Sequence, residues 1–190
     1  MKTLPGIPQI LFNRFYSIFR TLPCIFCTLA IASSVSAQET DNAMLKYGLN
    51  FLKTPYVAHT LEVNEEEKLV VNFDEVDCTT FVEYVLALAL SPVKNGTIDN
   101  ADYARTLQSI RYRDGKIDGY TSRLHYIADW VNNGVRHGFM EDITAANSPD
   151  TVRLSLNFMS AHSKAYKHLE SSPENISKIE EIEKSLSGQL

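Results

Sequence analysis

Cysteines and long hydrophobic runs are scarce in this 190-residue sequence, and acidic residues are absent from its first 38 positions. No aspartate or glutamate occurs before Glu39, although three basic residues do. The apolar run over residues 22–35 is shorter than the roughly 20 residues that a membrane-spanning helix needs. A basic start, a short apolar run and small residues up to Ala37 are typical of a removable secretory signal. We therefore predict a signal peptide over residues 1–37 and export to the periplasm or the outside of the cell.

A transmembrane anchor is the alternative interpretation of the same stretch. Cys24 and Cys27 are not preceded by the small residues of a lipoprotein signal, so the sequence predicts no lipid anchor either. We expect the exported chain to have no stable membrane anchor.

Only one cysteine, Cys78, remains after residue 37. An exported chain with one cysteine cannot form an internal disulfide, and a lone thiol in an oxidising compartment is a liability unless it is buried or used. Composition alone leaves open whether Cys78 is a buried apolar residue or a reactive one.

Basic residues are too few for a nucleic-acid surface. Three of the 18 basic residues but none of the 23 acidic ones lie before residue 38, so cleavage would change the formal charge from −5 to −8. Phosphate contacts need basic patches, which argues against nucleic acid as a partner. The histidines and cysteines show no zinc-binding spacing, and the sequence predicts neither a metal nor a cofactor.

The spacing of apolar residues predicts a mostly helical domain over residues 38–190. Alternation at 60–63 and 69–73, on either side of a polar run, predicts one β-hairpin. Two Asp-Gly pairs predict turns between residues 112 and 120. The predicted helices span residues 42–53, 78–90, 99–109, 122–133, 154–169 and 174–186.

The helix predicted over residues 78–90 begins with the cysteine. Asp77 is a good N-cap, so Cys78 would be the first helical residue. A thiol in that position lies at the positive end of the helix dipole, which favours the nucleophilic thiolate. Its backbone N–H would be one of the unpaired donors of the helix and could bind a tetrahedral oxyanion.

Several motifs occur in an order that resembles a known family. Residues 77–83 are Asp-Cys-Thr-Thr-Phe-Val-Glu, after Thr-Pro-Tyr-Val at 54–57. Arg-Tyr-Arg-Asp-Gly at 111–115, Arg-Leu-His-Tyr at 123–126 and Asn-Phe-Met-Ser at 157–160 follow. The set resembles the NlpC-type cysteine peptidases of peptidoglycan and, more closely, a bacterial family described as N-acetylmuramoyl-L-alanine amidase-like.

The resemblance implies an α+β, papain-like core in which the cysteine-bearing helix packs on an antiparallel sheet. It implies hydrolysis of an amide bond in peptidoglycan or a muropeptide, with Cys78 as nucleophile and Tyr56 near the substrate cleft. In that superfamily a catalytic histidine lies on a later strand, in a His-Xaa-Gly context, and we find no such strand here. We therefore expect the N-terminal part of the fold, with the core sheet largely missing and the domain incomplete at its C-terminus. The alternative is an inactive remnant or a protein that binds cell-wall fragments.

The remaining candidate residues have structural as well as functional interpretations. His125 and Asp129 are four residues apart and would share a helix face, as a base with its orienting carboxylate, a pair in the cleft or a structural pair. Arg111 and Arg123 could bind the carboxylates of a muropeptide, since a guanidinium binds a carboxylate in a bidentate manner. The alternative is that both are ordinary surface arginines with no role in binding. Glu83, in an apolar helix, should find a structural hydrogen-bond partner.

Overall fold

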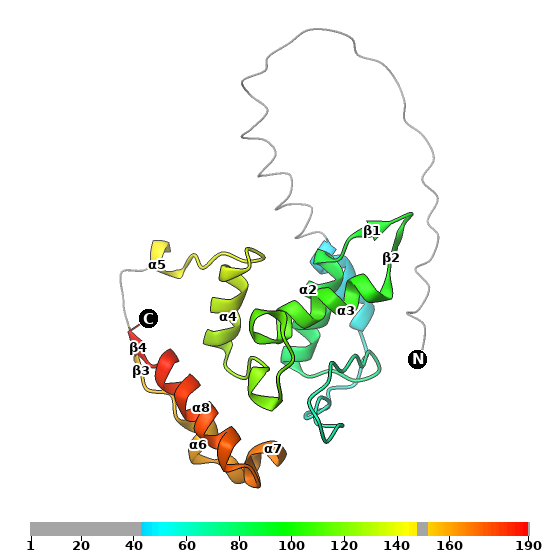
Figure 1. Ribbon diagram of the computed structural model, residues 1–190. Coiled ribbons are helices and arrows are strands. Elements are labelled where there is room, and N and C mark those ends of the chain that lie inside the picture. Colours follow the sequence, from blue (N-terminus) through cyan, green and yellow to red (C-terminus); the bar gives the residue numbers. More distant parts are fainter. Residues whose placement is uncertain (1–42, 148–151, 190) are drawn as a thin grey trace, which may run out of the picture. The chain divides into compact units, whose positions relative to one another are not determined.

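The computed structural model describes residues 43–147 and 152–189 (Figure 1). The predicted signal peptide, its cleavage site after Ala37 and both early cysteines lie outside these residues. None of the helices that the structure describes is long and apolar enough to cross a membrane.

Residues 43–48 are helical and continue into a 3-10 helix, η1, at Leu49–Phe51. The further elements are α2 (Cys78–Leu90), β1 (Val93–Lys94), β2 (Thr97–Ile98), α3 (Asn100–Arg111), η2 (Arg113–Gly115), η3 (Tyr120–Ser122), α4 (Ile127–Arg136), α5 (Thr144–Asn147), β3 (Arg153–Leu154), α6 (Phe158–Ala161), η4 (Ser163–Ala165), α7 (Lys167–Glu170), α8 (Pro173–Leu186) and β4 (Gly188–Gln189).

Helix α2 has the predicted bounds, and its first turn shows why it begins at Cys78. The Asp77 carboxylate accepts a hydrogen bond from the Thr80 N–H at 2.8 Å, while the Thr80 hydroxyl accepts one from the Asp77 N–H at 2.9 Å. This reciprocal capping box satisfies donors that a helix N-terminus otherwise leaves unpaired. The first turn is therefore held by bonds between residues within three positions of each other.

The main hydrophobic core lies between α2, α3 and the aromatic residues that precede them. Tyr84, Ala87, Leu107 and Ile110 are fully buried in it. Phe51 packs against Phe73, Phe81 and Tyr84, with ring centroids 5.7 to 6.3 Å apart. The predicted amphipathic helix at residues 42–53 is thus confirmed over 43–51 and is held to α2 by aromatic contacts.

The predicted hairpin over residues 60–73 is wrong. Residues 59–63 form turns and 69–72 have no regular structure. Side chains take the hydrogen bonds that a partner strand would have taken: Tyr112 donates to the Lys68 carbonyl, Arg111 to the Val70 carbonyl, and the Asn72 N–H donates to the Tyr84 hydroxyl. The β-structure of the described residues consists of two antiparallel pairs of two-residue strands, β1–β2 and β3–β4.

Two predicted helices differ from the structure by more than two residues at an end or are interrupted. The helix predicted from residue 122 begins at Ile127, because Arg123 forms an antiparallel bridge with Tyr112 and the Leu124 N–H donates to the Arg111 carbonyl. The helix predicted over 154–169 is divided into α6, η4 and α7.

These short helices pack against α8 around a second, smaller core. Met159, Leu169 and Ile179 are buried there together with Tyr120. The Glu183 carboxylate of α8 accepts hydrogen bonds from the backbone N–H groups of Met159 and Ser160 at 3.0 and 3.1 Å. This carboxylate accepts hydrogen bonds from backbone N–H groups that the start of α6 would otherwise leave unpaired, and its negative charge lies at the positive end of the helix dipole.

Candidate functional site

Cys78 is exposed at the head of α2. The nearest polar contact of its Sγ is Thr79 Oγ1 at 4.0 Å, and no described group accepts a hydrogen bond from the Cys78 N–H. The thiol and a free backbone donor therefore lie together at the positive end of a 13-residue helix. Of the two interpretations left open by composition, a buried apolar cysteine does not fit this placement.

Tyr56 lies beside the segment that leads to the cysteine. Its backbone forms a parallel bridge with Val76, supported by the Val57 N–H to Val76 carbonyl bond at 3.0 Å and the Val76 N–H to Pro55 carbonyl bond at 3.1 Å. The Tyr56 side chain is 71% exposed. Tyr56 thus lies against the segment two residues before Cys78, with its phenol exposed.

Arg111 lies in the core behind the cysteine helix and is 1% exposed. Its Nε donates to Glu83 Oε2 at 2.7 Å and its Nη1 to the Val70 carbonyl at 2.6 Å. Burial raises the pKa of the Glu83 carboxyl, and the Arg111 charge opposes that shift. The hydrogen bond expected for Glu83 is present. Of the two interpretations of Arg111, the structural one fits this buried position, since no guanidinium surface is left for a substrate.

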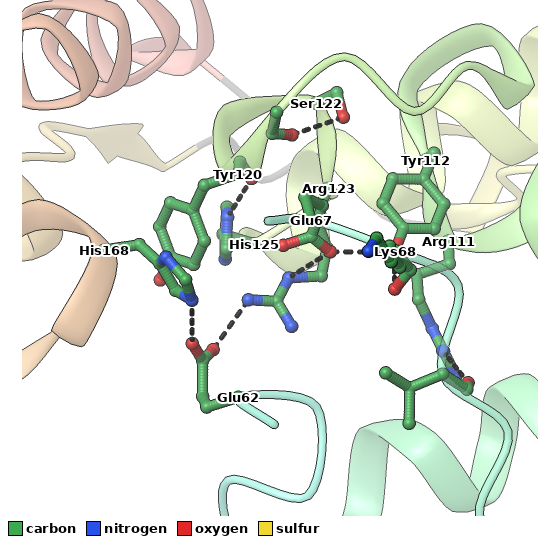
Figure 2. A network of polar contacts seen from close by, with 12 residues as sticks. Glu62, Glu67, Lys68, Arg111, Tyr112, Tyr120, Ser122, Arg123, His125 and His168 are labelled. Carbon is green, nitrogen blue, oxygen red and sulfur yellow. Dashed lines mark hydrogen bonds and ion pairs between the residues drawn. The ribbon is translucent and has the colours of Figure 1, made fainter. Parts of the chain in front are cut away.

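Arg123 is buried in a network of charged side chains, shown in Figure 2. Its Nη2 donates to Glu62 Oε1 at 2.6 Å, and its Nε lies 3.6 Å from Glu67 Oε1. The Tyr112 hydroxyl shares its one proton between the same Glu67 oxygen, at 2.7 Å, and the Lys68 carbonyl, at 3.1 Å. The predicted contact of Arg123 with a muropeptide would have to displace these carboxylates. Glu62 and Glu67 were not among the predicted site residues, because they fall in the expected hairpin and its turn.

His125 belongs to the same network rather than to the surroundings of Cys78. Its Nε2 lies 3.0 Å from the Tyr120 carbonyl oxygen, and its ring lies against the Tyr120 ring at a centroid distance of 4.4 Å. Burial, followed by the charge of Arg123, lowers the pKa of His125 to about 3. The imidazole is therefore neutral at physiological pH and a weak proton acceptor.

The pair expected from the spacing of His125 and Asp129 does not form. His125 precedes α4, which begins at Ile127, so the two residues do not share a helix face. The Asp129 carboxylate instead pairs with Arg113. In Figure 2 the His125 ring lies beside Tyr120, and no histidine of the described residues hydrogen-bonds to Cys78.

Two of the shallow hollows on the described surface lie away from Cys78. One is lined by His59, Glu62, Ala165, Tyr166 and Lys167, and the other by residues 161–165. No group of three histidine, cysteine, aspartate or glutamate side chains in the described part of the chain is arranged to hold a metal ion.

The fold and the site define a mostly helical protein with a small amount of antiparallel sheet and an exposed cysteine at the head of its central helix. Residues 46–188 match the AmiA-like family, described as N-acetylmuramoyl-L-alanine amidase-like. Because the match covers most of the sequence, the chain belongs to that family. No curated protein matches the chain significantly.

Solved structures are similar to this chain as well. An N-acetylmuramoyl-L-alanine amidase from Bacteroides uniformis is 61% identical, with a TM-score of 0.75, over 77% of this chain and 63% of that protein. A Bacteroides fragilis protein with the provisional name of a xylanase is 58% identical, with a TM-score of 0.73, over the same shares. LPG0564 from Legionella pneumophila shares the fold at 19% identity, with a TM-score of 0.56, over 84% of this chain and 58% of that one. The chain thus spans less than two thirds of the length of each.

Proposed function

We propose that this chain carries the nucleophile of an exported peptidoglycan amidase, with Cys78 attacking the amide that joins N-acetylmuramic acid to L-alanine. The observation that carries the proposal is the exposed thiol at the first residue of α2, beside a backbone N–H with no described acceptor. The family assignment and the amidase from Bacteroides uniformis support the choice of bond. We also propose that the chain is of the NlpC type and papain-like.

In the proposed reaction the Cys78 thiolate adds to the carbonyl carbon of the lactyl group, and the free Cys78 N–H stabilises the oxyanion that forms. The C–N bond then breaks, the amino group of L-alanine leaves with a proton, and a thioester remains on Cys78. Water hydrolyses the thioester and regenerates the thiol. Tyr56, exposed beside the same segment, contacts the substrate.

A base that takes and returns the proton is the second requirement of this reaction. His125 does not suit that role, because its imidazole contacts Tyr120 and its pKa is lowered to about 3. We propose that the base belongs to the part of the solved amidases that this chain does not match, which is more than a third of the Bacteroides uniformis protein.

The test is turnover of purified muropeptides, read by mass spectrometry, by the chain alone and by the chain mixed with the unmatched segment of the Bacteroides uniformis amidase. We expect release of the intact peptide only in the mixture, and its loss on Cys78→Ala. Turnover by the chain alone would place the base within it. A folded mixture that leaves muropeptides intact would favour a protein that only binds cell-wall fragments.

A further inference from the structure

The dipeptide Asn-Gly occurs twice in the sequence, and the structure places the two copies in opposite surroundings. Asn95-Gly96 forms the turn of the β1–β2 hairpin (Figure 1), whereas Asn133-Gly134 lies inside α4. The carbon of an asparagine amide is an electrophile, and a following glycine leaves the next backbone nitrogen unshielded because it has no Cβ. Such a dipeptide can therefore react within itself wherever its surroundings allow the two atoms to meet.

The copy at Asn95 lies in an open turn. Both of its residues are exposed, with φ values of 53° and 78°. These are the two left-handed conformations that a two-residue type I′ turn requires. Beyond the chain neighbours, no atom lies within 4 Å of the position that a Cβ on Gly96 would occupy. Among the described residues no group hydrogen-bonds to the Asn95 side chain, so the dipeptide is accessible to water and to base.

The hairpin around this turn opens at low cost. Its strands have two residues each and pair Val93 with Ile98 and Lys94 with Thr97. A two-stranded hairpin is marginally stable even when it is longer than this one. The attack requires the turn to leave its left-handed conformation, so that the glycine nitrogen can approach the side-chain carbon. Because only a few bonds oppose this local opening, the reactive conformation is populated in the folded chain.

The copy at Asn133 is held on every side. The asparagine is fully buried, its Nδ2 donates to the Ser109 carbonyl at 3.2 Å, and its Oδ1 accepts from the Asp114 N–H at 3.1 Å. Gly134 is buried in α4, and the Met140 side chain packs so closely on it that a Cβ there would clash. Attack at this copy would require α4 to unwind and both amide hydrogen bonds to break. The same dipeptide thus has a much higher cost of opening here.

We propose that Asn95 is a site of spontaneous deamidation in the folded chain and that Asn133 is protected from the same reaction. The backbone nitrogen of Gly96 loses its proton to base and forms a bond to Cγ of Asn95. The bond from Cγ to the side-chain nitrogen breaks, ammonia leaves with a proton from water, and a succinimide ring remains. Water then opens the ring at one of its two carbonyl groups, which yields either aspartate or isoaspartate.

The products change the contacts of the hairpin. Each places a new carboxylate next to Lys94, whose Nζ lies 2.8 Å from Asp102 Oδ2 at the start of α3, so the two carboxylates compete for one ammonium. Isoaspartate also adds one carbon atom to the backbone of the turn and thereby disturbs the pairing of Lys94 with Thr97. The reaction loosens the hairpin from α3. It does not involve Cys78, so this proposal stands or falls separately from the amidase reaction.

The experiment follows both copies in one digest. The folded chain is incubated in mildly alkaline buffer, and samples are cleaved with trypsin and analysed by mass spectrometry. Peptides 95–105 and 124–136 each contain one Asn-Gly. We expect Asn95 to be converted at least about tenfold faster than Asn133 in the folded chain. In urea, which removes the hairpin and α4, the two rates should approach each other.

Isoaspartyl methyltransferase provides a second readout, because it labels the isoaspartate product. Peptide 95–105 of the incubated chain should be labelled. Asn95→Gly is the matched control: Gly-Gly suits the same type I′ turn but has no side-chain amide, so labelling of this peptide should fall to background. Equal conversion of Asn95 and Asn133 in the folded chain would overturn the proposal. A difference in rate that persists in urea, or labelling that persists in Asn95→Gly, would do the same.

Discussion

At the scale of single residues, the buried pair of Glu83 and Arg111 has the largest energetic consequence. Both side chains are almost fully enclosed, and removal of one leaves the other as an uncompensated charge. We expect Glu83→Ala to lower the free energy of unfolding by about 3–5 kcal/mol. Urea unfolding followed by circular dichroism measures this value. Glu66→Ala, on the exposed loop, serves as the control and should change it by less than about 0.5 kcal/mol.

The same reasoning predicts that the pair itself is replaceable. Glu83→Leu together with Arg111→Met removes both charges and keeps most of the volume, so we expect the double variant to recover most of the stability lost in Glu83→Ala. A double variant as unstable as the single one would mean that the hydrogen bond of Arg111 to the Val70 carbonyl, rather than the ion pair, dominates.

His125 predicts a dependence of stability on pH. Its pKa in the folded chain is about 3, below the value of about 6.5 that it has when unfolded. Between these values the unfolded state binds the proton and the folded state does not, so stability falls as the pH falls from about 6.5 toward 3. His125→Gln should show a smaller loss over this window in thermal unfolding, whereas His162→Gln, at an exposed position, should follow the unaltered chain. Parallel curves for His125→Gln and the unaltered chain would contradict the burial argument.

At the scale of elements, the capping box decides how well α2 presents its cysteine. Asp77→Ala loses the bond to the Thr80 N–H, and we expect a cost of about 1 kcal/mol in stability together with slower alkylation of Cys78 by iodoacetamide at neutral pH. Asp77→Asn keeps the acceptor and should retain most of the stability. An unchanged alkylation rate in Asp77→Ala would show that the reactivity of the Cys78 thiol does not depend on how well the first turn of α2 is ordered.

Individual elements show which bounds can be predicted from local sequence patterns. The bounds of α2 follow from the capping signal at Asp77, which acts within a few residues. Residues 60–73 of the loop at 56–76 were predicted as a hairpin because their polar and apolar residues alternate. That pattern does not reveal that Arg111 and Tyr112, more than 40 residues later, take its backbone hydrogen bonds.

At the scale of the whole molecule, the sequence predicted the family and the placement of Cys78 better than the surroundings of the other candidate residues. The motifs that carry the resemblance are short and local, whereas the roles of Arg111, Arg123 and His125 depend on partners such as Glu83, Glu62 and Tyr120. A guanidinium that binds a substrate and one that holds a core have the same local sequence. Only the burial of the arginine side chain and the identity of its partners distinguish the two roles.

Glu183 connects the second core to α4 and α6. Its carboxylate binds the Tyr126 hydroxyl at 2.6 Å and two backbone N–H groups of α6. We expect Glu183→Ala to make residues 152–189 sensitive to limited proteolysis while the fragment with α2 and α3 resists, because its own core does not involve α8. Mass spectrometry of the fragments locates the cuts, with Glu180→Ala as the control. Equal resistance of Glu183→Ala and the unaltered chain would show that apolar packing alone holds α8.

The side-chain bonds that hold the loop at residues 56–76 have a consequence for synthesis on the ribosome. The loop leaves the exit tunnel well before Arg111 and Tyr112, the residues that satisfy its backbone carbonyls. Until these residues emerge, the Lys68 and Val70 carbonyls lack the side-chain donors that they have in the folded chain. The loop that precedes α2 is therefore completed only after α3 has been synthesised, and chaperones meet it in an unfinished form until then.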